Sequence, residues 1–219
     1  CVDEGAKAEF SVNGIKYSAT MARSPMYPAK DHDIAVGVTS IDITGAEPAS
    51  IGGKAEKGLG ITLLGYGCTD PERGRLGRDG ILRYGETVVV NFSAYDMVSR
   101  KPGGAALCFG DSGGPAFIFE RGKHLLLGVN SKGNISDTNY NTRTDIIESR
   151  SYLEKIANTK NIEICGINKT CGDTPPPPAA PACTLIATPQ AIILGQSVLL
   201  SLTTSGQVTE AILEGQGVS

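Results

Sequence analysis

Short runs of β-branched and other apolar residues alternate with glycine- and proline-containing turns along most of the chain before Asp173. Runs of this kind, bounded by turn residues, are typical of β-strands. They predict strands at 16–21, 33–40, 59–65, 86–92, 116–119 and 125–129. The pattern therefore indicates an all-β body built from short strands.

One segment of this body has a different periodicity. Between 145 and 158, apolar residues recur at spacings of three, four and seven: Ile146, Ile147, Leu153, Ile156 and Ala157. This spacing places apolar side chains on one face of an α-helix. We expect a single amphipathic helix to close the body at its C-terminal end.

A proline-rich stretch divides the chain. The four consecutive prolines Pro175–Pro178 favour a polyproline II spacer, because they cannot continue a helix or a central strand. After them, apolar runs around the Gly195-Gln196 turn within 192–202 and at 211–213 predict the first strands of a β-sandwich. We therefore expect a body at 1–171, a linker at 172–182 and a partial β-module at 183–219.

Composition and charge narrow the function classes. The chain has 219 residues with 20 Lys+Arg against 23 Asp+Glu, a net charge of -3. This balance argues against nucleic-acid binding through overall basic charge. No apolar run approaches the roughly 18 residues of a membrane-spanning helix, so we expect no membrane span.

Six cysteines, at 1, 68, 108, 165, 171 and 183, are spread along the chain without a CxxC pair. Because the chain has only two histidines, we expect no Cys/His zinc site. Dispersed cysteines in a glycine-rich β protein are typical of disulfides in an oxidising compartment, so we expect a secreted, extracellular protein. The chain begins with Cys1 and has no leader pattern, which indicates a processed product or a fragment.

The segment Cys108–Pro115, Cys-Phe-Gly-Asp-Ser-Gly-Gly-Pro, is the most informative stretch of the sequence. A serine hydroxyl is a useful nucleophile only where a base removes its proton and fixed donors stabilise the oxyanion. Gly110 and Gly113 flank Ser112 with residues that accept unusual backbone angles, so the amides of Gly110 and Ser112 can point into one cavity. Gly-Asp-Ser-Gly alone is a common surface turn, but the longer run followed by an apolar strand favours a nucleophile.

This segment resembles the active-site signature of the trypsin/chymotrypsin-like serine endopeptidases. Asp31-His32-Asp33-Ile34-Ala35-Val36 resembles the strand that carries the family's catalytic carboxylate, and it precedes Ser112 in the family's chain order. The resemblance spans about residues 1–160. It implies two six-stranded antiparallel β-barrels, the first incomplete here, with Ser112 as nucleophile and Asp33 orienting the catalytic histidine. The oxyanion hole would be formed by the amides of Gly110 and Ser112.

The family's catalytic histidine directly precedes a cysteine, so the resemblance places it just upstream of Cys1. Neither His32 nor His124 is expected to replace it, since His32 adjoins Asp33 and would point to the opposite face of a strand. We therefore expect the chain itself to be nearly inactive. In an alternative interpretation Cys1 is the lipid-anchored cysteine of a bacterial lipoprotein, and the chain is a pseudo-protease that serves as a secreted binding or adhesion module.

The resemblance also implies substrate contacts. Ser131 and Gly133 would lie beside the specificity pocket, in the strand that pairs with the substrate backbone. Ala106 occupies the position where trypsin-like members keep an aspartate, so we expect no strong preference for cleavage after Lys or Arg.

The family's usual disulfide partner of Cys108 is absent from this chain. We prefer a Cys68–Cys108 pairing, while Cys165 and Cys171 could close a small loop. Because six cysteines allow many connectivities, both pairings remain open.

These expectations converge on a serine endopeptidase of the secreted bacterial type. It would act on a protein or peptide substrate as a monomer and need no cofactor. The region from Cys183 resembles the immunoglobulin-like modules appended to secreted bacterial enzymes, and would serve as a spacer or adhesion unit or only as a solubilising extension.

Overall fold

The structure is a computed structural model that describes residues 2–69, 80–120 and 122–171, and the backbone of two further strands, β11 and β12. The chain divides into two units, Cys1–Gly172 and Asp173–Ser219. The predicted proline-rich linker lies outside the described residues, except for Ala182, which begins β11. The division of the chain into three functional regions stays a prediction.

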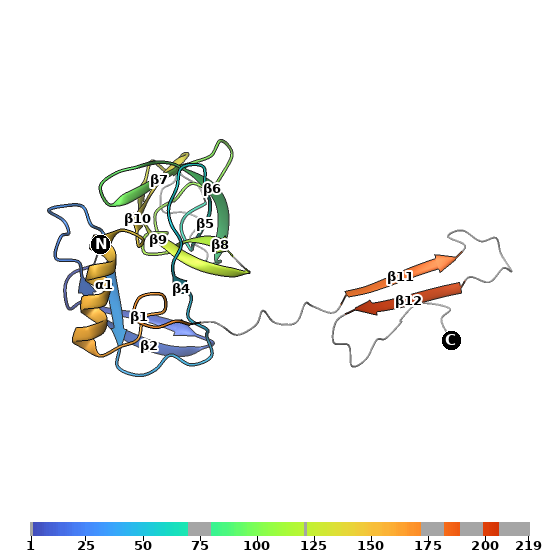
Figure 1. Cartoon of the computed structure of the whole chain (residues 1–219), viewed down its shortest axis with the longest axis horizontal. Coiled ribbons are helices and arrows are strands. Elements are labelled where there is room, and N and C mark those ends of the chain that lie inside the picture. Colours follow the sequence, from blue (N-terminus) through green and yellow to red (C-terminus); the bar gives the residue numbers. More distant parts are fainter. Residues whose placement is uncertain (1, 70–79, 121, 172–181, 189–198, 206–219) are drawn as a thin grey trace. The chain divides into compact units, whose positions relative to one another are not determined.

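The larger part of the first unit is a closed β-barrel (Figure 1). Its strands pair antiparallel in the order β10-β7-β6-β5-β8-β9, and β10 also pairs with β9, which closes the ring. The strand bounds are β5 Gly60–Gly65, β6 Arg83–Phe92, β7 Asp96–Arg100, β8 Pro115–Glu120, β9 Lys123–Gly133 and β10 Thr138–Arg143. A short strand, β4 (Ser50–Ile51), adds to β9 in parallel.

A separate three-stranded antiparallel sheet precedes the barrel in the sequence. It has the order β1-β2-β3, with bounds Lys7–Val12, Ile15–Arg23 and Ala35–Thr39. The expected all-β class with one closing helix is confirmed. The expected first, incomplete barrel stays a prediction, because the described residues before β4 form this open three-stranded sheet.

The barrel interior is the main apolar core. Fully buried side chains from facing strands meet there, among them Val89, Met97 and Leu127. Their burial follows from strand alternation, because successive side chains point to opposite faces and only one face looks into the barrel. The barrel is therefore a packed body that fixes the loops at its ends.

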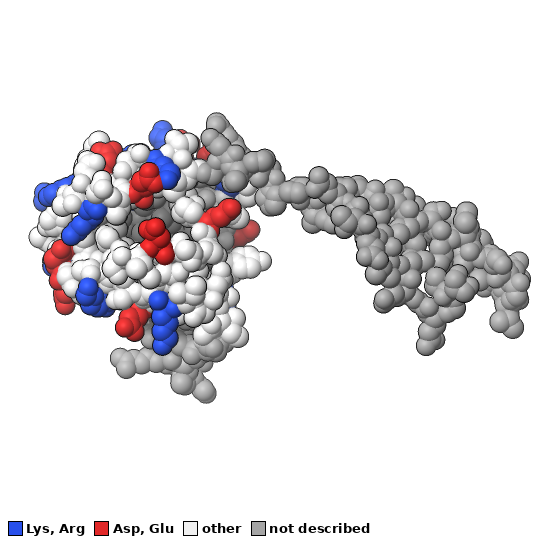
Figure 2. Space-filling model, turned by 90° about the horizontal axis from the view of Figure 1, so that it is seen from below, with Lys and Arg blue, Asp and Glu red and all other residues white. Residues whose placement is uncertain are grey.

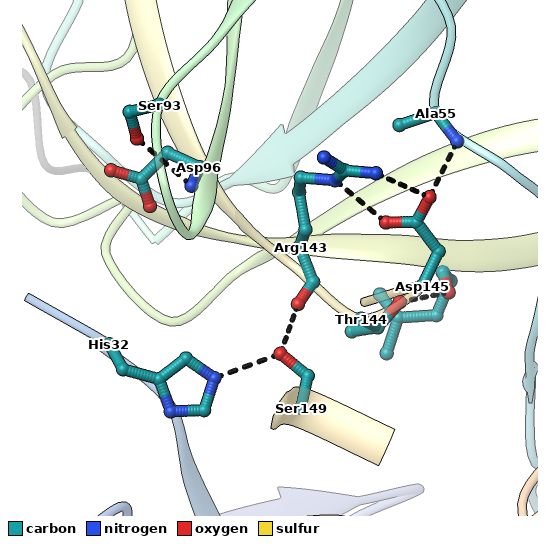
Figure 3. Close-up of polar contacts among 9 residues, drawn as sticks. His32, Ala55, Ser93, Asp96, Arg143, Thr144, Asp145 and Ser149 are labelled. Carbon is teal, nitrogen blue, oxygen red and sulfur yellow. Dashed lines mark hydrogen bonds and ion pairs between the residues drawn. The ribbon is translucent and has the colours of Figure 1, made fainter. Parts of the chain in front are cut away.

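The single helix of the described residues, α1, spans Ile147–Lys160, about two residues later than the sequence pattern predicts. The helix begins late because Asp145 is engaged elsewhere, accepting hydrogen bonds from Arg143 and from the amide of Ala55 (Figure 3). Leu153 and Ala157 are buried as expected, but Ile147 is 72% exposed. The buried face instead includes the polar Ser149.

Ser149 is buried because it connects α1 to His32. Its hydroxyl lies 2.9 Å from His32 Nε2 and donates to the carbonyl oxygen of Arg143 (Figure 3). On the other side of the ring, His32 Nδ1 lies 2.6 Å from the Ser24 hydroxyl. The His32 side chain is 0% exposed. These contacts fix the segment between β2 and β3 against the helix.

Burial lowers the pKa of His32, with a smaller opposing effect of Glu148. The unfolded chain then binds more protons than the folded one as pH falls below about 6.5, so stability present above that pH is lost on acidification. We expect the unfolding free energy to fall between pH 7 and pH 5 with a slope of at most about 1.4 kcal/mol per pH unit from this group. Denaturant unfolding followed by circular dichroism measures the slope.

The His32→Gln variant should lose this contribution to the slope, whereas the His124→Gln variant should keep it, because His124 is exposed. Equal slopes in the two variants would contradict the assignment to His32.

Charged side chains of both signs are interspersed on the face of the molecule shown in Figure 2. This agrees with the near balance of 20 basic and 23 acidic residues. Among the described residues, no helix combines the length and apolar character needed to cross a membrane.

In the second unit, β11 (Ala182–Thr188) pairs antiparallel with β12 (Leu199–Ser205). The strand β12 begins within the apolar run predicted at 192–202 and continues beyond it, whereas β11 was not predicted as a strand. The other predicted strand residues, 192–194 and 211–213, lie outside the described residues. The immunoglobulin-like module therefore stays a prediction.

Candidate active site

The two residues expected to carry catalysis, Asp33 and Ser112, lie on either side of Ser131. Asp33 is in the segment between β2 and β3, Ser112 is in the loop before β8, and Ser131 is near the end of β9. The Ser131 hydroxyl donates to Asp33 Oδ2 at 2.7 Å. The Ser112 hydroxyl lies 3.4 Å from the Ser131 carbonyl oxygen. Ser131 thus contacts both the Asp33 carboxylate and the Ser112 hydroxyl, which are far apart in the sequence.

The loop around Ser112 presents its hydroxyl to solvent. Gly110 and Gly113 have φ angles of 104° and 84°, which side-chain-bearing residues adopt only with strain. Ser112 is exposed, and its amide and that of Gly110 donate no hydrogen bond to another described residue. Free amides beside a serine hydroxyl are what an oxyanion hole requires.

Asp111, the residue between Gly110 and Ser112, fixes the loop through its carboxylate. Its Oδ1 accepts a hydrogen bond from the Gly67 amide at 2.7 Å, and its Oδ2 accepts one from the Cys108 amide at 2.8 Å. A Cβ atom at Gly67 would lie 2.4 Å from the Asp111 carboxylate, so residue 67 has no room for a side chain. The Asp111 carboxylate therefore links the Ser112 loop to the chain that follows β5.

Two further features fix the same loop. The Cys68–Cys108 disulfide is formed, and so is Cys165–Cys171, which confirms both sequence-based pairings. Asn130, which is 2% exposed, donates its side-chain amide to the carbonyl oxygens of Leu64 and Asp111 at 3.0 and 3.3 Å. Sequence reasoning missed Asn130, although an asparagine at the end of an apolar strand run was a signal that it has a polar partner.

Neither histidine of the chain is placed to act on Ser112. Both ring nitrogens of His32 face serine hydroxyls, those of Ser24 and Ser149. His124 lies at the start of β9, paired with Phe119, and is seven residues before Ser131 on the same strand. At about 3.3 Å per residue, His124 is separated from Ser131 by roughly 23 Å along the strand.

Two cavities border the Ser112 loop. One, of about 230 Å³, is lined by Ser112 itself and by the predicted substrate-contacting residues Ser131 and Gly133. The other, of about 220 Å³, is lined by Asp111 and by Ala106. The structure thus brings Ser131 and Gly133 to Ser112 but places Ala106 in the lining of the second cavity. Leu107, which was not singled out in the sequence, borders both.

An ion cluster lies beside the first cavity. The ammonium group of Lys132 pairs with Asp31 and lies 3.5 Å from Asp96 Oδ2. Asp96 is 2% exposed, and its burial raises the pKa of its carboxyl despite the nearby ammonium. Because Asp31 precedes β3 while Lys132 and Asp96 belong to the barrel, the cluster holds the Asp33 segment against β9.

Comparison with known proteins agrees with this architecture. A solved structure of a mutant of human heparin binding protein (CAP37) is similar to this chain with a TM-score of 0.51 and 18% sequence identity, over 66% of this chain and 67% of that one. At this identity the likeness shows a shared fold. No curated protein sequence matches the chain. The family model described as Trypsin matches residues 3–156, which is more than half of the chain. The chain therefore belongs to the trypsin family.

Proposed function

We propose that the chain belongs to a secreted serine endopeptidase that hydrolyses peptide bonds through an acyl-enzyme. Ser112 Oγ attacks the carbonyl carbon and loses its proton, and the amine leaves with a proton. Water then cleaves the resulting ester and restores the hydroxyl. The observation that carries this proposal is the exposed Ser112 hydroxyl beside the amides of Gly110 and Ser112, which donate to no other residue that the structure describes.

The general base is the histidine that the family pattern places directly before Cys1. A serine hydroxyl needs such a base, and within the described residues both histidines lie elsewhere. Asp33 holds the tautomer of this imidazole, while Ser131 holds Asp33. The two disulfides support an oxidising, extracellular location.

The residue encoded directly before Cys1, and a fluorophosphonate probe, test this proposal. We expect that residue to be histidine, and we expect the polypeptide that includes it to be labelled at Ser112. The Ser112→Ala variant should not be labelled. A residue other than histidine, together with no labelling, would overturn the proposed activity.

The second candidate is a non-catalytic binding protein, and the similar structure named as a heparin binding protein favours it. A polyanion such as heparin requires a concentrated basic surface. The net charge of -3 and the interspersed charges of Figure 2 do not favour such a ligand here. An unlabelled polypeptide that keeps its fold would support this candidate.

Adding a methyl group at residue 67 should impair the oxyanion hole. In the Gly67→Ala variant the added methyl group displaces Asp111 and with it the neighbouring amides. In a polypeptide extended to include the proposed histidine, we expect kcat to fall by about 10² to 10³, which is the effect of losing an oxyanion-hole donor. The Gly60→Ala variant is the matched control, because a Cβ atom there meets open space. Equal kcat values in the two variants would exclude this role of Asp111.

A further inference from the structure

The cavity of about 230 Å³ beside Ser112 is placed to receive a side chain of the substrate. For attack, the substrate carbonyl carbon must lie about 3 to 3.5 Å from Ser112 Oγ. The side chain attached to that carbonyl group is then within one residue of Ser112. The cavity that contains Ser112 receives this side chain, and the cavity around Ala106 does not contain Ser112.

None of the eight described residues that line this cavity is acidic. Its one charged residue, Lys132, already faces the carboxylates of Asp31 and Asp96. A basic substrate side chain would find no free counterion, and an acidic one would meet an ammonium group that two carboxylates already neutralise. Burying either charge without a partner is costly, so the cavity favours uncharged side chains.

Leu107 forms an apolar wall of the cavity and is held in place by a buried amide. Its backbone N–H donates to Asn139 Oδ1 at 2.7 Å, and Asn139 Nδ2 donates to the Ala105 carbonyl oxygen at 3.0 Å. Asn139 is 0% exposed and Leu107 is 7% exposed. A Cβ atom at Gly133 would lie 3.7 Å from Leu107 Cβ, so Leu107 faces the strand end that carries Gly133.

Ile135 also lines the cavity, in a conformation that is unfavourable for a β-branched residue. Its φ angle is 66°, in the left-handed region. The Asn134 side chain enforces this turn by accepting hydrogen bonds from the amides of Ser136, Asp137 and Thr138. A strained residue that its surroundings hold in place at a ligand cavity is a sign of a functional position.

From these observations, and resting on the proposed peptidase function, we infer that the cavity selects an uncharged apolar side chain on the acyl side of the cleaved bond. Leu107 and Ile135 are the residues that set this preference. The family-based position Ala106 does not set it, because it lies in the other cavity.

Peptide binding tests this inference without requiring catalysis. N-acetyl-Ala-Ala-X acids, with X as Leu, Phe, Lys or Glu, are titrated into the 219-residue chain while the Ile135 methyl signal is followed by NMR. We expect the Leu or Phe peptide to bind at least about 10-fold more tightly than the Lys and Glu peptides, and to shift that signal. Equal or tighter binding of the Lys or Glu peptide would overturn the inference.

Three variants assign the determinants. Leu107→Ala should shift the preference from Leu toward Phe by about 10-fold, the effect of a few methylene groups. Ile135→Gly should weaken binding of the Leu peptide while leaving thermal stability unchanged or higher, because glycine accepts its backbone angle. Ala106→Asp should not improve binding of the Lys peptide. A gain of about 10-fold there would move the determinant to Ala106 and overturn the assignment.

The outcome is separable from that of the proposed function. Selective binding of apolar peptides without fluorophosphonate labelling of the longer polypeptide would contradict the proposed enzymatic activity and support the inferred selectivity of the cavity. Labelling of Ser112 together with unselective peptide binding would support the proposed enzymatic activity and contradict the inferred selectivity.

Discussion

Substitution of Ser112 by alanine is expected to lower kcat by about 10⁶ in a polypeptide extended to include the histidine proposed before Cys1, because no acyl-enzyme can then form. The residual rate should still exceed that of water by about 10³ to 10⁴, since the amides of Gly110 and Ser112 remain in place. Hydrolysis of a peptide ester or anilide, measured under single-turnover conditions, gives the rate.

The Ser40→Ala variant is the matched control, because Ser40 is an exposed serine outside the site. The 219-residue chain, which has only His32 and His124, should be as slow as the Ser112→Ala variant. If the Ser112→Ala variant kept a substantial share of the rate, another group would be the nucleophile and the proposed mechanism would be wrong.

The second large effect is expected at Asp33. In the Asp33→Asn variant the amide can no longer hold the required tautomer of the imidazole, so kcat should fall by about 10⁴. Asp42→Asn removes a negative charge at an exposed position and serves as the control. The pH profile of kcat/KM separates this role from a structural one, because the acidic limb reports the pKa of the histidine.

The loss of the Asp33 carboxylate should lower that histidine pKa, since a nearby negative charge stabilises the imidazolium form. A fall in kcat with an unchanged acidic limb would point to misfolding around Ser131 and against the proposed contact with the histidine. Thermal unfolding of the variant, compared with Asp42→Asn, provides the same distinction independently.

Local sequence determined the helix, the Ser112 motif and six strands of the body, β2, β3, β5, β6, β8 and β9, whereas β1, β4, β7 and β10 were not predicted. Apolar runs bounded by turn residues at 59–65 and 116–119 predict strands because such a pattern is a property of neighbouring residues. The Ser112 motif can be recognised in the sequence for the same reason, since its glycines and serine lie within one short loop. The trypsin family followed from these residues, and the family model over residues 3–156 confirms it.

Only the tertiary structure decided how these segments meet. The Ser131 hydroxyl reaches Asp33 across 98 residues, and His32 reaches Ser149 across 117. No local periodicity encodes such pairs, so the helix pattern could not show that Ser149 is buried while Ile147 is exposed. The structure alone also shows that Leu107 borders both cavities whereas Ala106 borders only the one without Ser112, because residues from several distant strands line each cavity. The sequence determined which chemical groups the chain carries, whereas long-range packing decided which of them share a site.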